Sequence, residues 1–326
     1  MSLLPPAEDH AIPEQPPMPN GIDLTTAWAR EVNMTVVGQP AATEGLLVAL
    51  LAGGHVLVEG PPGTGKRLAA QALAASIGAE FSEAPMLETA ADSLSHLQSV
   101  WGPASAPTGE VRLLTGLHQA SPRLQARLGH ALDSVAAGSR SGGPGNQAPF
   151  MLVGSRQPAD VTGAFPLSEG LADRFTLSIT LDVLSLDEEA RLVREIALSA
   201  ADSMLEVAAP EAVLNATEVV TLRRRSREVK VADTLVTYVA NIVRATRFAP
   251  LLATGASPRA AIALIRCAQA RALLQGRDYS VADDVKALAG AVLSHRVRLA
   301  DAPRLDGLSL RQVLSELLDQ VAAPRP

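Results

Sequence analysis

Residues 60–67 read Gly-Pro-Pro-Gly-Thr-Gly-Lys-Arg, and this stretch decides the fold. It follows a short apolar run at 55–59 and precedes a helix-forming segment at 68–77. A strand, a glycine-rich loop and a helix in this order form a cradle for phosphate. The glycines let backbone N–H groups converge on an anion, and the helix N-terminus adds the positive end of its dipole. The stretch therefore predicts a phosphate-binding loop.

Every position of this loop is a candidate nucleotide contact: Gly60, Pro61, Pro62, Gly63, Thr64, Gly65, Lys66 and Arg67. Lys66 is placed to reach the outer phosphates. The pattern then requires Ser or Thr, whose hydroxyl holds Mg²⁺, but this chain has Arg67. The alternative is a Gly-Pro turn that binds no ligand. The strand and helix on either side favour the phosphate loop.

The composition is that of a globular protein, with 47 % hydrophobic and 19 % charged residues among 326. Only 3 % are aromatic, so Ala, Leu and Val must build the core, and such chains favour helices. The net charge is −6 with dispersed Lys and Arg, which gives no case for nucleic-acid binding. The single cysteine, Cys267, lies in an apolar helical pattern and is expected to be a buried packing residue.

The sequence carries no sign of export or membrane insertion. Its N-terminus lacks the basic and apolar regions of a signal peptide, and no apolar run approaches the length of a membrane span. We expect a cytoplasmic protein. Residues 1–20 contain six prolines and no periodicity, which predicts a disordered leader.

The order of apolar segments predicts two domains. Helical stretches separate strand-like runs at 55–59, 111–114, 150–153 and 175–181. This alternation is typical of an open parallel sheet with helices on both faces, which binds ligands at the carboxyl ends of its strands. We expect little regular structure at 82–110 beyond one helix near 90–100, a helix from 121 to about 135, and a flexible loop at 138–147.

After residue 183 the strand signals stop. We expect helices at 187–200, 231–246, 258–275, 281–293 and 309–321. The predicted organisation is an α/β nucleotide-binding domain at 21–183 followed by an all-helical domain at 184–326.

Several further segments accompany the loop: Val37-Gly38-Gln39, Ala-Pro-Phe-Met-Leu-Val at 148–153, Gly-Ala-Phe-Pro-Leu at 163–167, Leu-Ala-Asp-Arg-Phe at 171–175, Gly-Ala-Ser-Pro-Arg at 255–259, and 276–296. Together they resemble the MoxR family of AAA+ ATPases, close to magnesium chelatase and other helix-2-insert members, over roughly residues 35–300. The resemblance implies a P-loop sheet flanked by helices, a helical lid, and a ring, usually of six subunits, with ATP between neighbours. It also implies chaperone-like remodelling of partners, often ones with a von Willebrand factor A domain.

The resemblance assigns roles to three further residues. Arg174 matches the arginine finger, whose guanidinium stabilises charge on the phosphoryl group in a neighbouring subunit's site. Arg259 matches the sensor-2 arginine of the lid, which would contact the nucleotide of its own subunit. Gln157 falls at sensor 1, where the family has Asn. The alternative for each arginine is a surface or ion-pair residue.

The chain departs from the family at the groups that break the phosphate bond. The family ends one strand with Asp-Glu, which hold Mg²⁺ and polarise water; aligned through the Ala-Ser-Pro at 120–122, those positions are Thr115 and Gly116. Arg67 removes the loop hydroxyl as well. Such a group commonly contributes about 10²–10⁴-fold, so losing several together predicts weak hydrolysis or none. ATP or ADP is the expected cofactor, and the sequence does not support a Mg²⁺ site.

Three further features are interpreted without a role in nucleotide binding or catalysis. The basic cluster at 223–227 is interpreted as a solvated face, with an interaction patch as the alternative. The six histidines show no metal-ligand spacing, so we expect no metal site. Asp182 ends an apolar run, but its position places it near the domain boundary rather than at the phosphates.

Three functions remain open. The first is a nucleotide-binding assembly or regulatory subunit of a ring, made with itself or with a catalytically intact paralogous subunit that Arg174 would serve. The second is an active ATPase that remodels partner proteins with residues the sequence does not single out. The third is a structural scaffold with an empty pocket. For Arg67 we keep three interpretations: it assists phosphate binding, points outward, or blocks the pocket.

Overall fold

The computed structural model describes residues 21–86, 109–141, 150–157, 165–198, 210–301 and 307–324. The leader expected at 1–20 and the helix expected near 90–100 lie outside these ranges. Within them, no helix has both the length and the apolar character needed to cross a bilayer.

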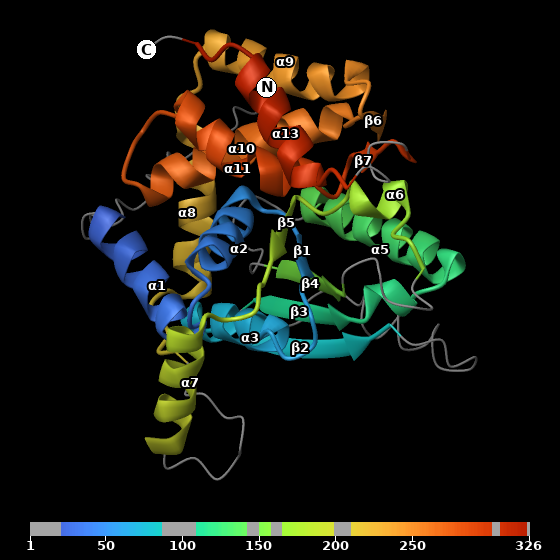
Figure 1. The fold of residues 1–326 in the computed structure, drawn as a ribbon. Coiled ribbons are helices and arrows are strands. Elements are labelled where there is room, and N and C mark those ends of the chain that lie inside the picture. Colours follow the sequence, from blue (N-terminus) through green and yellow to red (C-terminus); the bar gives the residue numbers. More distant parts are fainter. Residues whose placement is uncertain are drawn as a thin grey trace, which may run out of the picture.

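The centre of the fold is a five-stranded sheet in which all strands are parallel and ordered β2-β3-β4-β1-β5 (Figure 1). Its strands are β1 (Val56–Glu59), β2 (Glu80–Pro85), β3 (Glu110–Thr115), β4 (Phe150–Arg156) and β5 (Leu177–Thr180). Because parallel strands end at one edge of a sheet, the segments after β1, β3, β4 and β5 converge there. The predicted parallel sheet is confirmed, and the glycine loop lies at this edge.

One strand was not expected. β2 occupies the start of the segment for which the sequence predicts little regular structure, and that prediction is wrong for residues 82–85. β2 reads Glu-Phe-Ser-Glu-Ala-Pro, pairs with β3 alone, and buries only Ala84 fully. An edge strand needs fewer apolar residues and tolerates a proline, so its sequence resembles a loop.

The strands divide their side chains between two helical layers because successive residues point to opposite faces. Leu57, Leu114 and Leu152 belong to a cluster with Leu124, Leu128 and Leu132 of α5 (Pro122–Ser141). Their neighbours in the strands, such as Val56, Val58 and Val153, belong to the main core. That core is covered by α1 (Gly21–Thr35), α2 (Pro40–Ala52) and α3 (Lys66–Ser76). The expected sheet with helices on both faces is confirmed.

α5 is longer than the sequence suggests. It begins at Pro122 after Ser121, whose hydroxyl accepts a hydrogen bond from the Leu124 N–H at 3.3 Å. It continues to Ser141, so the loop expected at 138–147 is wrong for residues 138–141. The rest of that loop, at 142–147, lies outside the described residues.

The C-terminal part is mainly helical. Its helices are α7 (Leu186–Leu198), α8 (Ala216–Glu228), α9 (Asp233–Phe248), α10 (Pro258–Leu274), α11 (Ala282–Leu293) and α13 (Leu310–Gln320). The helices α9, α10, α11 and α13 pack together as a bundle, whereas α7 lies apart from them (Figure 1). The C-terminal part is not all-helical, because β6 (Leu252–Thr254) and β7 (Arg298–Leu299) form a small antiparallel pair. Strands of three and two residues are too short to show a period-two pattern, which is why the sequence missed them.

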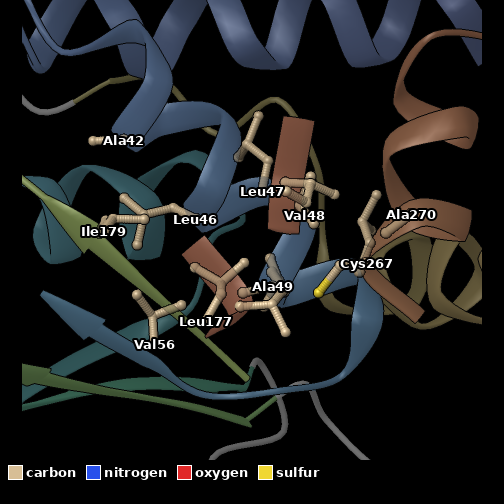
Figure 2. Packing of buried hydrophobic residues seen from close by; sticks show 14 of the residues in the cluster. Ala42, Leu46, Leu47, Val48, Ala49, Val56, Leu177, Ile179, Cys267 and Ala270 are labelled. Atoms are coloured by element: carbon tan, nitrogen blue, oxygen red, sulfur yellow. The ribbon is translucent and has the colours of Figure 1, made fainter. Parts of the chain in front are cut away.

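Helix α2 joins the sheet to this bundle. Figure 2 shows Leu46 of α2 beside Ile179 of β5, and Ala49 of α2 between Leu177 of β5 and Cys267 of α10. The apolar core is therefore continuous across the expected domain boundary near 184. Cys267 is fully buried, and burial raises the pKa of its thiol to about 12, which confirms its packing role.

The basic cluster at 223–227 is not wholly a solvated face. Arg223 of α8 is mostly buried, and its Nε donates to the carbonyl oxygen of Leu50 at 2.7 Å. Burial lowers the pKa of its guanidinium to about 10, with the nearby charge of Arg227 as a second cause. Arg223 thus satisfies a carbonyl near the end of α2 and ties α8 to it. The structure corrects the solvated-face interpretation at this residue.

Candidate nucleotide site

The glycine loop joins β1 to α3. Gly65 precedes the helix with φ of +86°, a left-handed conformation that favours glycine, and no side chain caps the first turn of α3. The Nζ of Lys66 donates to the carbonyl oxygens of Gly60 and Pro61, at 2.7 and 2.6 Å. The Thr64 hydroxyl donates to the same Pro61 oxygen at 2.9 Å. A phosphate would compete with these carbonyls for the ammonium group.

A cavity of about 800 Å³ lies beside the loop, within the usual range for small-molecule sites. One wall consists of loop residues 62–67 and the start of α3. Another is apolar, built by Val36, Val37, Leu184, and by Leu192 and Ile196 of α7. A cavity that combines apolar side chains with the backbone N–H groups of the loop suits a ligand with a planar base and a phosphate tail.

The end of β3 reaches this cavity, and both Thr115 and Gly116 line it together with Lys66. Gly116 has φ of +75° and precedes a short helix, η1 (Leu117–Gln119). A Cβ added at Gly116 would lie 3.1 Å from Oε1 of Gln119. A glutamate there would be strained by about 1–3 kcal/mol. The backbone at Gly116 therefore disfavours the water-polarising carboxylate that the resemblance would place here.

Gln157 follows β4 and lines the cavity, where the structure pairs it with a residue that the sequence did not single out. Its backbone N–H donates to Nδ1 of His118, at 3.4 Å between the two nitrogens. Because Nδ1 is the acceptor, the neutral ring carries its proton on Nε2. Burial lowers the pKa of His118, and the charge of Lys66 lowers it further. His118 thus adds a polar group within the electrostatic reach of Lys66.

Arg67 also lines the cavity, but its guanidinium is held at the edge of the sheet. Its Nε donates to Oε2 of Glu83 on β2 at 2.7 Å. The Arg67 side chain is 63 % exposed and that of Glu83 is 32 % exposed. An exposed ion pair of this kind is weak, typically about 0–1 kcal/mol. Arg67 is therefore restrained loosely and does not block the loop.

The carboxylates among the described lining residues lie on the far side of the loop. They are Asp182, which follows β5, and Glu189 of α7. Asp182, near the expected domain boundary, also lines the cavity. However, β4 and β1 separate β3 from β5, and at about 4.8 Å per strand the two are about 14 Å apart. Asp182 therefore does not replace the missing carboxylates at the end of β3.

Another acid near the loop, Glu59, already forms an ion pair with an arginine. Glu59, the last residue of β1, accepts hydrogen bonds from Arg156 NH2 at 2.5 Å and from the Ser178 hydroxyl at 3.0 Å. Arg156 ends β4 and lines the cavity. This pair therefore ties β1 to both neighbouring strands under the loop and supplies no free charge.

The two arginines with family roles lie together and away from this cavity. Arg174 follows α6 (Glu169–Ala172), and its Nε and NH2 donate to the carboxylate of Asp133 on α5, at 3.1 and 2.5 Å. The Asp133 pKa is lowered mainly by the hydrogen bond from Arg174, and the charge of Arg259 contributes. Arg259 is exposed in the first turn of α10. Neither arginine lines the described cavity, so the structure does not bring Arg259 to the loop of its own subunit.

The segment that carries Arg174 is locked to the lid. Arg296 donates to Oδ1 of Asp173 at 3.0 Å and to the carbonyl oxygens of Phe175 and Thr176 at 2.5 and 2.9 Å. The Ser257 hydroxyl, at the start of α10, lies 2.9 Å from the other oxygen of Asp173. Arg174 therefore has fixed neighbours on both sides.

Fold and site together define the class: a P-loop nucleotide-binding protein with a parallel sheet and a helical lid. Two family models match the chain, the AAA lid domain at residues 244–317 and magnesium chelatase subunit ChlI at residues 33–109. A crystal structure from Cytophaga hutchinsonii, of a protein proposed to be an ATPase, superposes with a TM-score of 0.77 over 94 % of this chain and 96 % of that one. It is 24 % identical, so it supports the fold alone.

The chain belongs to the MoxR family of AAA+ ATPases. It is 30 % identical to the uncharacterized protein YeaC of Bacillus subtilis, over 90 % of this chain and 92 % of that protein. It is 29 % identical to the chaperone MoxR1 of Mycobacterium tuberculosis, over 90 % of this chain and 81 % of the relative. Membership implies nucleotide binding in general and a chaperone-type role.

Proposed function

We propose that this chain binds ATP or ADP beside the glycine loop, hydrolyses it weakly or not at all, and acts as an assembly or chaperone subunit of an AAA+ ring. One observation carries the proposal. Thr115 and Gly116 line the cavity beside Lys66, where the family has the carboxylates that hold Mg²⁺ and polarise water. Phosphoryl transfer depends on positioned metal and water, so a site without these groups binds phosphate better than it cleaves it.

The arginines support a role at a neighbour's site. Arg174 and Arg259 lie on a surface away from the cavity of their own chain. We therefore replace the expected own-subunit role of Arg259 with one shared with Arg174. Both guanidinium groups would stabilise negative charge on the phosphates bound in an adjacent subunit. If that subunit is a catalytically intact relative, this stabilisation would speed its ATP hydrolysis. Whether the ring contains one kind of subunit or two, and whether it acts on a von Willebrand factor A domain, stay predictions of the resemblance.

Nucleotide binding and turnover are measured on the pure full-length chain. We expect ATP to raise the melting temperature without phosphate release, because a ligand that binds only the folded state stabilises it. Lys66→Ala should remove the shift. Metal-dependent phosphate release that Lys66→Ala abolishes would support the active ATPase instead. No shift at millimolar ATP, with or without Mg²⁺, would support the scaffold.

The role of Arg174 is measured by adding this chain to a catalytically intact MoxR-family protein. We expect faster phosphate release from the mixture, and Arg174→Ala should remove the increase. Arg123→Ala, an exposed position in the first turn of the same α5 that carries Asp133, is the matched control and should keep it. Equal turnover with and without this chain would contradict the mixed ring.

A further inference from the structure

The residues at the phosphate end of the cavity do not fit a divalent cation. Mg²⁺ takes oxygen ligands, usually with one or two carboxylates among them. The three positions that would supply the loop hydroxyl and the two carboxylates hold Arg67, Thr115 and Gly116. Within the described ranges, no group of three or more His, Cys, Asp or Glu side chains is arranged to hold a metal. At residue 67, a permanently charged arginine stands at the sequence position where the family has a hydroxyl ligand.

Arg67 is positioned to exchange one anion for another. It is the second residue of α3, so its backbone belongs to the helix N-terminus where phosphates bind. Its guanidinium now pairs with Glu83, two residues before the end of β2, and the pair is largely exposed. Glu83 offers one carboxylate oxygen to Arg67, whereas a phosphate offers several and more charge. A phosphate in the cavity would therefore compete effectively for the guanidinium.

We propose that this site takes nucleoside triphosphate in its metal-free form, with Arg67 leaving Glu83 to occupy the place of Mg²⁺. The inference rests on the proposed nucleotide binding and specifies the ligand. Mg²⁺ neutralises part of the triphosphate charge and would introduce a second cation beside Arg67 with no carboxylate to hold it. Both effects weaken binding. Mg²⁺ should therefore weaken the binding of the triphosphate to this site, whereas it strengthens binding to a site that has metal ligands.

The test measures the Kd of ATP for the full chain by titration calorimetry, in EDTA and in excess Mg²⁺. We expect binding about threefold or more tighter in EDTA, where the triphosphate keeps its full charge. Arg67→Thr, which restores the family's hydroxyl, should weaken binding in EDTA by about tenfold or more, the effect of one charge-assisted hydrogen bond, and should abolish the preference for EDTA. Arg224→Thr, an exposed arginine of α8 outside the cavity, makes the same charge change and should leave both values unchanged.

Glu83→Gln provides an independent arm, because it removes the competing carboxylate without touching the loop. We expect ATP to bind up to about fivefold tighter in EDTA, the range of one exposed ion pair. Tighter binding in Mg²⁺ than in EDTA, together with an unchanged affinity in Arg67→Thr, would overturn this inference while nucleotide binding itself stands. Absence of binding in both media by the wild-type chain would overturn the proposed function and the inference together.

Discussion

Two arginine–carboxylate pairs mark two regions of this molecule with opposite properties. At the phosphate end of the cavity, Arg67 and Glu83 form an exposed pair with one hydrogen bond. At the junction of core and lid, Arg296 is only 3 % exposed and contacts the carboxylate of Asp173 and several backbone carbonyls. The first region tolerates change because little of the fold rests on it. The second does not, because its loss would leave buried charges and carbonyls without partners.

The same contrast separates the loop side of the cavity from the segment that carries Arg174. Residues 67, 115 and 116 line the cavity; Arg67 is exposed, and Thr115 and Gly116 are half-buried. Arg174 follows directly on Asp173, which Arg296 and Ser257 hold from the lid. These contacts hold the segment that carries Arg174 in place, independently of any role of Arg174 at a neighbour's site.

The largest expected effect is that of Arg296→Ala. It removes one partner of a buried pair, and we expect the free energy of unfolding to fall by about 3–5 kcal/mol. Urea denaturation followed by circular dichroism measures the change. Arg298→Ala, at an exposed position of β7, is the matched control and should stay within about 0.5 kcal/mol of wild type. An equal effect of the two variants would remove the contrast between regions.

Acid should destabilise the same junction. The Nε2 of His295 lies 2.9 Å from the carbonyl oxygen of Phe175, and burial, followed by the charge of Arg296, lowers the pKa of His295 to about 3. The unfolded chain, with an ordinary histidine pKa near 6.5, therefore takes up the proton first. Stability is full above about pH 6.5 and falls by about 1.4 kcal/mol per pH unit below it, toward the folded pKa.

Denaturation at several pH values between 4 and 7 measures this slope. His55, whose pKa burial lowers to about 4, adds a similar dependence over part of the range. We expect His295→Gln to make the slope shallower, whereas His130→Gln, on the exposed surface of α5, should leave it as in wild type. A slope that His295→Gln does not change would refute the assignment.

A moderate effect is expected from restoring metal ligands. Arg67→Thr combined with Thr115→Asp places a hydroxyl and a carboxylate beside Lys66, and we expect Mg²⁺ to tighten ATP binding by about tenfold, or about 1.4 kcal/mol. Hydrolysis should remain low, because Gly116 has a backbone conformation that disfavours glutamate. Calorimetry with and without Mg²⁺ and a phosphate-release assay measure the two quantities. Affinity that stays independent of Mg²⁺ would show that more than these ligands is missing.

The smallest effect is expected from Arg67→Ala without nucleotide. The pair with Glu83 is exposed, so the free energy of unfolding should change by less than about 1 kcal/mol. Urea denaturation at low and high salt measures it, and salt should reduce what difference there is. A loss comparable to that of Arg296→Ala would mean that the rim of the cavity also supports the fold.

Much of the architecture could be predicted from the sequence because local residue patterns specify it. The apolar run before the loop, the glycines at 60, 63 and 65 and Lys66 specified β1, the phosphate loop and α3. The placement of Thr115 and Gly116 beside the loop followed from the alignment, and the cavity contains both. The polar edge strand β2 was missed because a pairing partner, β3, specifies it rather than its own composition.

The amino-acid sequence specifies which chemical groups stand at each motif position: a lysine at 66, an arginine at 67, and no carboxylate at 115 or 116. Which of these groups come into contact depends on the folded chain. Glu83 lies beside Arg67 because β2 pairs with β3. His118 meets Gln157 because β3 and β4 are neighbours, and Arg259 lies near Asp133 because α10 starts against Asp173. Such contacts join residues apart in the chain, and their distances are fixed by the pairing of strands and by the packing of sheet against lid.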